Sequence, residues 1–405
     1  MKVLRKIFKR HFRQSLAWLM IYLMLLNTLP RAARAKPAGP EVVAGSANIV
    51  QSNNTTNVQM LSDKAVINWD SLDTSYNEVL SFLKTSDFAV LNRVIKGGPT
   101  QFDGSLFAEN GSVFIVNTQG LIFGPSSYIQ ARNFVGSSLN ITNDDFLNGQ
   151  YRFVGGDGVV VNRGDIIAQD VALIGQKVLN AGTIVSPGGC IVLAAGDSVF
   201  LGQEGSTVFV EVDTAGVPEA ANSQIPNDYA DVTNEGTVTT DGGTIVLAAG
   251  DTFSRAIANV GNLAASAGTV TIDAARINNK GTISTDGVEG DAGTINLHAG
   301  EEVVLSENSL TSANAGANGD GGKVTVKAEG AAIVENGARI EAKGGSLSGD
   351  GGFVEISGEH FLLAGDIDAS ATNGESGTFL IDPTTVTIKD GARPPSPPPD
   401  TIYEN

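Results

Sequence analysis

A phrase of 18 residues occurs twice in this chain and returns in altered form a third time. Residues 180–197 read NAGTIVSPGGCIVLAAGD and residues 234–251 read NEGTVTTDGGTIVLAAGD, with identity at 12 of 18 positions. The third copy, residues 279–301, carries a five-residue insertion. Short apolar runs between Gly, Asn and Asp turns are typical of a β-solenoid, where each unit buries its apolar face against its neighbours. The repeat therefore predicts an all-β fold, a β-solenoid.

Residue alternation within the repeats predicts which side chains face inward. In residues 295–298 (INLH) and 324–327 (VTVK), apolar residues alternate with polar ones, as in strands with one buried face. Residues 191–193 are apolar throughout, which predicts either a strand covered on both sides or an exposed apolar stripe. Asparagines begin all three copies, and we expect them to stack as amide ladders do: Asn180, Asn234 and Asn279.

The first 35 residues have the pattern of a signal peptide. Six Lys and Arg residues precede an apolar run at residues 16–29, and Ala33-Arg34-Ala35 supplies an A-x-A cleavage site. A membrane-spanning helix needs about 20 apolar residues, more than this run provides. We therefore prefer cleavage after Ala35 to a retained membrane anchor.

The charge that remains after cleavage restricts the choice of partners. The leader holds eight of the 26 Lys and Arg residues and none of the 44 Asp and Glu residues, so its removal leaves a formal charge of −26. Such a chain repels nucleic acid and anionic lipid, so we expect neither as a direct partner. Cys190 is the only cysteine, so no internal disulfide can form. It takes the repeat position of Thr244, where we expect a small packed residue.

Composition divides the remaining chain into three segments. Residues 36–155 contain longer strand-like runs and no copy of the repeat phrase. Residues 156–390 carry the repeats, with Gly, Asn and Asp between short strands. Residues 391–405 include the run RPPSPPPD, which predicts an extended, proline-rich tail.

Motifs in the first of these segments point to a family. The runs LNRV (residues 91–94), GSLFAENGSVFIVNTQGLIFGPSSYIQARNFVGSSLNI (104–141) and DFLNGQYRF (145–153) resemble the filamentous haemagglutinin N-terminal domain, also called the two-partner secretion domain. The run DKAVINWDSL (63–72) resembles the opening strands of that family. The similarity covers most of residues 45–155.

One turn departs from the family pattern. Family members have Asn-Pro-Asn-Gly where this sequence has Asn117-Thr118-Gln119-Gly120. A β-turn is still expected, because Asn bonds to its own backbone and Gly tolerates positive φ. The replaced centre matters only if a partner protein contacts this turn directly.

The resemblance implies a right-handed parallel β-helix with an N-terminal capping and secretion module. It also implies export by the leader to the periplasm of a Gram-negative bacterium, then transfer in unfolded form to an outer-membrane β-barrel transporter with periplasmic docking domains. The expected product is a secreted or cell-surface, adhesin-like protein with a host-cell or glycan surface as a further partner. Candidate residues for cap folding or transporter recognition are Asn92, Arg93, Asn117, Gly120, Phe123 and Gly124. For Arg93, one of few cations, we expect a buried or interface ion pair.

Features that suggest catalysis or metal binding have simpler interpretations. The Gly-Asp clusters at residues 155–158 and 349–352 do not recur every nine residues, so we interpret them as corners rather than calcium sites. His298 and His360 lack a nearby set of zinc ligands in the sequence. Acidic residues recur at equivalent repeat positions, whereas an active site occurs once: Asp197, Asp251 and Glu301.

We therefore predict no enzyme, no cofactor and no metal. Two alternatives stay open at this point. One is a β-helical polysaccharide-active enzyme, which would need a single cluster of acids on one face. The other is the truncated stem of a larger exoprotein or toxin.

Overall fold

The computed structural model describes residues 35–204, 207–213, 230–250, 256–383, 387–390 and 401–404. Residues 36–405 form one compact unit, and the predicted leader up to residue 34, with Ala33, lies outside the described residues. Strands dominate, and the single helix in the described ranges is α2 (Asn143–Asn148). No helix in this part of the chain is long and apolar enough to cross a membrane.

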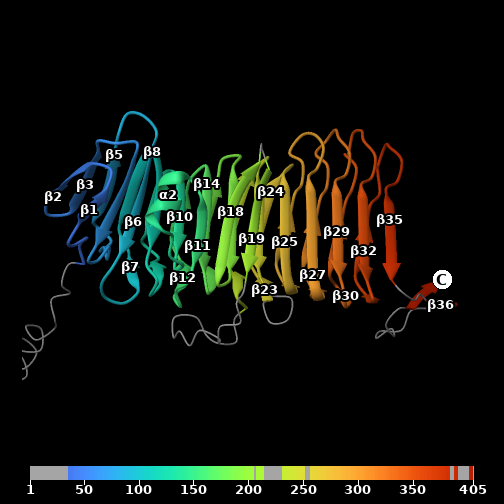
Figure 1. The fold of residues 1–405 in the computed structure, drawn as a ribbon. Coiled ribbons are helices and arrows are strands. Elements are labelled where there is room, and N and C mark those ends of the chain that lie inside the picture. The colour runs from blue at the N-terminus through green and yellow to red at the C-terminus, as the bar shows by residue number, and fades with distance from the viewer. Residues whose placement is uncertain are drawn as a thin grey trace, which may run out of the picture. The chain divides into compact units, whose positions relative to one another are not determined.

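Parallel strands form three stacks along the unit, and successive turns of the chain add one strand to each stack (Figure 1). The first stack contains β3 (Thr55–Met60), β5 (Val79–Leu83), the first parts of β8 (Ser105–Val116) and β10 (Tyr128–Ser137), β13 (Asp165–Ile167), β16 (Thr183–Ser186), β21 (Thr237–Asp241), β24 (Asn262–Ser266), β26 (Thr282–Ser284), β28 (Leu310–Ser312), β31 (Arg339–Glu341) and β34 (Asp366–Asp368).

The second stack contains β4 (Lys64–Trp69), β6 (Phe88–Val94), the second parts of β8 and β10, β14 (Asp170–Gly175), β17 (Cys190–Ala195), β22 (Thr244–Ala249), the first parts of β25 (Thr269–Asn279) and β27 (Thr294–Leu305), β29 (Lys323–Ala328), β32 (Phe353–Gly358) and β35 (Thr378–Pro383). The third contains β7 (Thr100–Phe102), β9 (Leu121–Phe123), β12 (Val159–Asn162), β15 (Lys177–Asn180), β20 (Val232–Asn234), β23 (Ala256–Asn259), the second parts of β25 and β27, β30 (Ala331–Val334) and β33 (His360–Leu363). The predicted all-β parallel β-helix is confirmed.

Antiparallel strands lie at the N-terminal end of the stacks. Strand β1 (Glu41–Ala44) pairs antiparallel with β4, and β2 (Ala47–Gln51) forms an antiparallel hairpin with β3. An exposed sheet edge invites unwanted pairing, and antiparallel strands at the first coil occupy that edge. The cap expected at this end is therefore present.

The interior of the β-helix is apolar along its whole length. One continuous cluster of buried side chains runs from Val58 in β3 to Ile356 in β32. The expected alternation is seen at residues 295–298, where Ile295 and Leu297 are buried and His298 is exposed. In β29 it holds only in part, because Thr325 is buried between Val324 and Val326. Each coil thus buries its apolar side chains against the coils on either side.

The first two copies of the repeat phrase lie on adjacent coils in register. Asn180 pairs with Asn234, and Cys190 pairs with Thr244. The third copy lies one coil further away, because residues 259–274 form a coil of their own between them. That coil reads NVGNLAASAGTVTIDA, so it is an additional, diverged copy that the sequence search missed.

A ladder of asparagine side chains runs through the interior at one corner. Each amide nitrogen donates to the side-chain oxygen one coil further on, over distances of 2.8–2.9 Å. Besides the three predicted members, it includes Asn162, one coil before them, and Asn259, between the second and the third. The full ladder is Asn162, Asn180, Asn234, Asn259 and Asn279. All are at least 99% buried, so the expected stacking is confirmed and extended.

A second layer covers part of the outer face of the second stack. It consists of α2 and a three-stranded antiparallel sheet of β11 (Tyr151–Val154), β18 (Ser198–Glu204) and β19 (Thr207–Asp213) (Figure 1). Phe146 of α2 and Val199 of β18 belong to a separate buried cluster with Val192 of β17. Of the two alternatives for residues 191–193, the strand covered on both sides is the one observed.

Little of the proline-rich tail lies within the described residues. Its described part is β37 (Thr401–Glu404), which pairs in parallel with β36 (Thr387–Asp390), the strand that precedes the tail. Residues 391–400, which hold the proline run, lie outside the described ranges, as does Asp251 of the second repeat copy.

Candidate functional site

The motif residues of the secretion-like segment lie mostly inside the first coils. Asn92 of β6 is fully buried and connects three neighbouring strands. Its side-chain oxygen accepts from Trp69 Nε1 at 3.0 Å, and its nitrogen donates to the Phe114 carbonyl at 3.2 Å. A buried amide needs such partners, so Asn92 links the second stack through β4, β6 and β8.

Arg93 points away from the core and binds the segment that leads into α2. Its guanidinium donates to the side-chain oxygens of Asn140 and Asn143 at 3.1 and 2.8 Å, and to the Ile141 carbonyl at 2.6 Å. Burial lowers the pKa of the Arg93 guanidinium. Each of the three guanidinium nitrogens thus donates to a neutral oxygen, so the buried ion pair expected for Arg93 is wrong. The interface ion pair, the other alternative, stays a prediction.

Helix α2 is held at both ends. At its start the Thr142 hydroxyl accepts from the backbone N–H of Asp145 at 3.0 Å, a standard N-cap. At its end Gly149 adopts φ +73°, and Lys64 Nζ donates to the Leu147 carbonyl at 2.7 Å. Cations from β4 and β6 therefore anchor a helix too short to be stable alone.

The variant turn forms as expected. The Gly120 N–H donates to the Asn117 carbonyl at 2.9 Å, and Gly120 has φ +123°. The Asn117 side chain is buried, accepts from the Gln119 N–H at 3.0 Å and donates to Thr100 Oγ1 at 2.9 Å. Asn117 and Gly120 thus supply the frame of the turn, and none of these bonds uses the Thr118 or Gln119 side chain.

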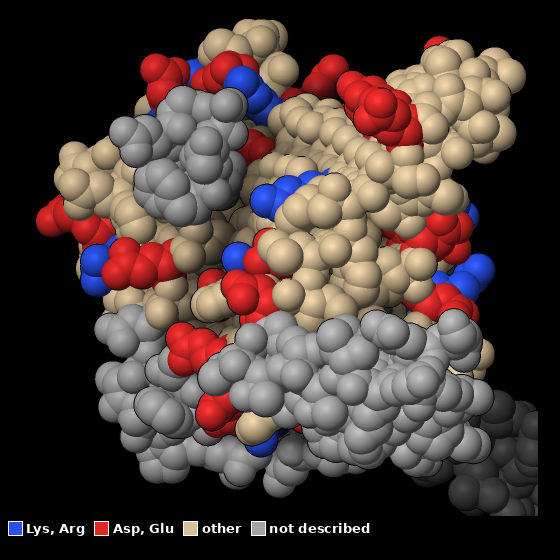
Figure 2. All heavy atoms as spheres, turned by 90° about the vertical axis from the view of Figure 1, so that its right-hand side faces the viewer, with Lys and Arg blue, Asp and Glu red and all other residues tan. Residues whose placement is uncertain are grey.

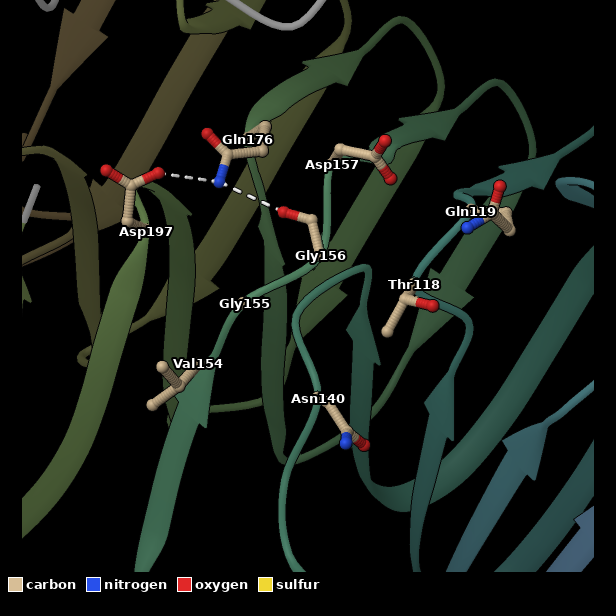
Figure 3. Close-up of a pocket in the computed structure, with 9 residues that line it drawn as sticks. All are labelled: Thr118, Gln119, Asn140, Val154, Gly155, Gly156, Asp157, Gln176 and Asp197. Atoms are coloured by element: carbon tan, nitrogen blue, oxygen red, sulfur yellow. Dashed lines mark hydrogen bonds between the residues drawn. The ribbon is translucent and has the colours of Figure 1, made fainter. Parts of the chain in front are cut away.

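Thr118 and Gln119 line an open hollow of about 580 Å³ beside the second layer (Figure 3). On the opposite side, Gln176 Nε2 donates to Asp197 Oδ1 at 2.8 Å and to the Gly156 carbonyl at 3.1 Å. The Gly-Asp cluster at 155–158 is a corner in this hollow. In the described ranges, no group of three His, Cys, Asp or Glu side chains is placed to hold a metal ion.

Phe123 and Gly124 end the third-stack strand β9. Phe123 is fully buried, with its ring centroid 6.1 Å from that of Phe102 and 5.6 Å from that of Phe134, both edge-on. A Cβ on Gly124 would lie 1.9 Å from Asp103 Oδ1. Both residues therefore contribute to packing of the corner, and neither offers a free functional group.

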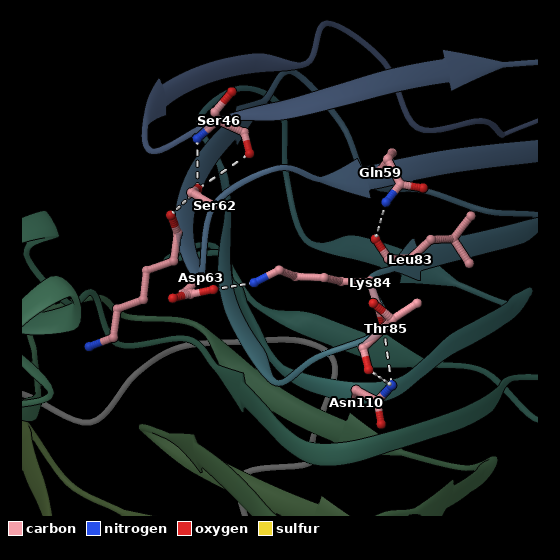
Figure 4. Close-up of polar contacts among 9 residues, drawn as sticks. Ser46, Gln59, Ser62, Asp63, Leu83, Lys84, Thr85 and Asn110 are labelled. Carbon is pink, nitrogen blue, oxygen red and sulfur yellow. Dashed lines mark hydrogen bonds and ion pairs between the residues drawn. The ribbon is translucent and has the colours of Figure 1, made fainter.

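Polar contacts also fasten the antiparallel cap to the coils (Figure 4). Ser62 Oγ accepts from the Ser46 N–H at 2.8 Å and donates to the Lys64 carbonyl at 2.6 Å. Lys84 forms an ion pair with Asp63, and its hydrogen bond lowers the pKa of the Asp63 carboxyl. The Ser46–Ser62 bond holds the cap on the first coil, whereas the Lys84–Asp63 pair joins the turn before β4 to the turn after β5. Because Asp63 is exposed, this ion pair adds little stability.

The TPS secretion domain family matches residues 33–251, which is more than half of the chain and includes the cap, the motif residues and the second layer. The chain belongs to this family. A TPS secretion domain marks an exoprotein of two-partner secretion, exported across the outer membrane to the cell surface or the extracellular space.

Relatives of known description agree with this assignment. A heme/hemopexin-binding protein of Haemophilus influenzae (strain KW20/Rd) is 27% identical over 221 residues, 50% of this chain and 24% of that protein. Another heme/hemopexin-binding protein of Haemophilus influenzae is 29% identical over 139 residues, 33% of this chain and 15% of that protein. The chain thus matches about a quarter or less of these curated relatives' length, and neither is described as an enzyme.

A solved structure supports the fold of this TPS secretion domain protein. The HMW1 secretion domain from Haemophilus influenzae superimposes with a TM-score of 0.73 at 24% identity, covering 91% of this chain and 98% of that chain. The family match continues past residue 155, and the stacks do too, because β9 pairs with β12 and β10 pairs with β14. The domain division at residue 155 stays a prediction.

Proposed function

We propose that this TPS secretion domain protein is the cargo of an outer-membrane β-barrel transporter with periplasmic docking domains. The family match over residues 33–251 carries this proposal, because a secretion domain requires a cognate exporter. The order of segments fits the route. Residues 1–35 act as the leader cleaved between Ala35 and Lys36, residues 36–155 form the secretion module, residues 156–390 form a stem, and residues 391–405 form the tail.

The motif residues act in two ways in this proposal. In the folded chain Asn92, Asn117 and Phe123 are buried, so they stabilise the first coils and present little surface to a partner. The transporter therefore contacts these residues before the coils close, while the segment is still extended. Arg93, Gly120 and Gly124 then fix the corner and the second layer as folding proceeds.

The surface role that we propose is adhesive or structural, with a host-cell or glycan surface as the further partner. A long stack of coils with exposed loops at its corners suits display of a binding surface away from the cell. Heme binding is a property of the described relatives, and the described residues of this chain give no reason to transfer it. The enzyme alternative lacks support from the relatives, and the alternative of a longer exoprotein stem is compatible with the matched lengths.

An export assay tests the first proposal. The chain is expressed with and without its cognate transporter, and the amounts in the periplasm, on the cell surface and in the medium are measured. We expect surface and medium protein only with the transporter. Asn117→Ala should reduce it, whereas Thr118→Pro with Gln119→Asn should not. Equal surface protein without the transporter would refute the proposal.

A further inference from the structure

A groove of about 570 Å³ runs across four successive coils, at the corner that precedes β27, β29, β32 and β35. Each coil contributes one glycine to the floor at the same position: Gly293, Gly322, Gly352 and Gly377. A Cβ on any of them would strike the backbone one coil earlier; at Gly352 it would lie 2.1 Å from the Gly322 carbonyl oxygen. The groove therefore runs along the β-helix axis and repeats its lining once per coil. This end of the stack carries many Asp and Glu side chains and few Lys or Arg (Figure 2).

Carboxylates form one bank of the groove. Asp320 Oδ1 accepts from the Asp350 N–H at 2.7 Å, and Asp350 Oδ1 accepts from the Glu375 N–H at 2.7 Å. These bonds fix the two aspartates in the same orientation on neighbouring coils, which lie ~4.8 Å apart. All three acidic residues are exposed, so they present acceptors at that spacing to whatever enters the groove.

The other bank combines an aromatic ring with a donor. Lys323, Phe353 and Thr378 occupy the same register position on β29, β32 and β35. Lys323 Nζ lies 5.5 Å from the Phe353 ring centroid. The ring is partly exposed and offers an apolar plate beside a hydroxyl and an ammonium group.

We propose that this groove binds an uncharged linear polysaccharide that runs parallel to the β-helix axis with one sugar unit per coil. Sugar hydroxyls donate to carboxylates and accept from ammonium and hydroxyl groups, and the C–H face of a sugar ring packs on an aromatic plate. A pyranose unit is about as long as the ~4.8 Å step between coils. This inference rests on the proposed surface role and gives that role a site.

Two other occupants fit less well. An anionic glycan would face three carboxylates of a chain whose formal charge is already −18. An extended cationic peptide satisfies the charge, but its like-facing side chains repeat every two residues, about 6.6–6.8 Å, out of step with the coils. The repeat distance therefore favours the sugar polymer.

Calorimetric titration of the full chain, purified from the producing cells whichever compartment it occupies, tests the proposal. The probes are neutral linear hexasaccharides of glucose, mannose and galactose, with oligogalacturonate and oligolysine for comparison. We expect saturable binding of at least one neutral hexasaccharide. Phe353→Ala should weaken it at least tenfold, as should Ser376→Arg, which fills the groove from an exposed position.

Matched controls are Tyr76→Ala, an exposed aromatic outside the groove, and Asp366→Asn, an exposed acid on the first stack. Both should bind as the unchanged protein does. Absence of binding to every neutral hexasaccharide would overturn the proposal, as would binding of oligolysine alone or unchanged binding by both groove variants. The readout does not depend on export, so failure of the export assay and failure of this proposal are distinguishable.

Discussion

Asn180 donates its side-chain amide to the side-chain oxygen of Asn234 at 2.8 Å, although 54 residues separate the two in sequence. Asn234 in turn donates its side-chain amide to the side-chain oxygen of Asn259 at 2.9 Å. An amide has both donors and an acceptor, so each inner member of the ladder bonds to the neighbours on both sides. The ladder thereby adds to the specification of register, because a slip of two residues would keep the apolar side chains inside but would break the amide bonds.

Breaking the ladder at its centre should destabilise the protein. Asn234→Leu removes the acceptor of Asn180 and the donor of Asn259, and each buried polar group left without its partner costs about 1–3 kcal/mol. We expect the free energy of unfolding to fall by about 2 kcal/mol or more in urea denaturation. Asn262→Ala, at a partly exposed position on the next coil, should change it by less than about 0.5 kcal/mol. Similar values for the two variants would contradict a structural role for the ladder.

A column of glycines at the corners should tolerate no side chain. A Cβ at Gly236 would lie 2.1 Å from the Gly182 carbonyl oxygen, and backbone cannot yield as a flexible side chain can. Gly236→Ala should therefore lower the thermal midpoint by several degrees, corresponding to about 2 kcal/mol. A Cβ at Gly98 would have no atom within 4 Å, so Gly98→Ala serves as the control. An unchanged thermal midpoint for Gly236→Ala would contradict this close backbone contact between the two coils.

Charge in the core should impair surface delivery if coil closure assists export. Leu247 is fully buried in β22, so Leu247→Asp places a carboxylate among apolar side chains and prevents that coil from closing. We expect less protein at the cell surface by protease accessibility, with periplasmic levels intact. Asn262→Asp adds the same charge at a partly exposed position. If Leu247→Asp reached the surface in unchanged amounts, export would not depend on closure of this coil.

The lone cysteine should be unreactive until the chain unfolds. Burial, together with the nearby Asp170 carboxylate, raises the pKa of Cys190 to about 12. The ordinary thiol pKa is about 8.5, so the unfolded state loses its proton first and the free energy of unfolding falls as the pH rises from about 8.5 towards 12. Thiol labelling at pH 8 should require denaturant. Cys190→Thr, which copies Thr244, should remove this pH dependence and leave the fold intact. Rapid labelling of native protein would contradict this placement.

Sequence periodicity predicted the features that repeat, and it missed those that do not. The ladder of Asn180 and Asn234 followed from copies that match residue by residue, as did the packed position of Cys190. The coil between the second and third copies escaped notice because Asn262 stands where the phrase has threonine. A search for N-x-G followed by a second Gly-Thr would have found it.

The second layer could not be predicted because no periodicity describes it. Strand β11 pairs with β18 from more than forty residues later, and α2 is only six residues long. The acceptors of Arg93 could not be predicted from the sequence either. They are two side-chain amides and a backbone carbonyl, which carry no charge that a sequence pattern would reveal. The apolar run at residues 191–193 was the one available signal that something covers this face.

The second layer determines how much of the chain must be present before the outer buried cluster is covered. Phe114 packs against Phe146 of α2 and Tyr151 of β11, with ring centroids 5.2 Å apart in both pairs. Val192 belongs to the same buried cluster as Val199 of β18, so this cluster is complete only when β18 has folded. A polypeptide cut after residue 197 would keep its first coils, α2 and β11, but it would lose β18 and β19, and with β18 the pairing partner of β11. The smallest self-sufficient fragment therefore extends to at least residue 213, well beyond the last motif residue.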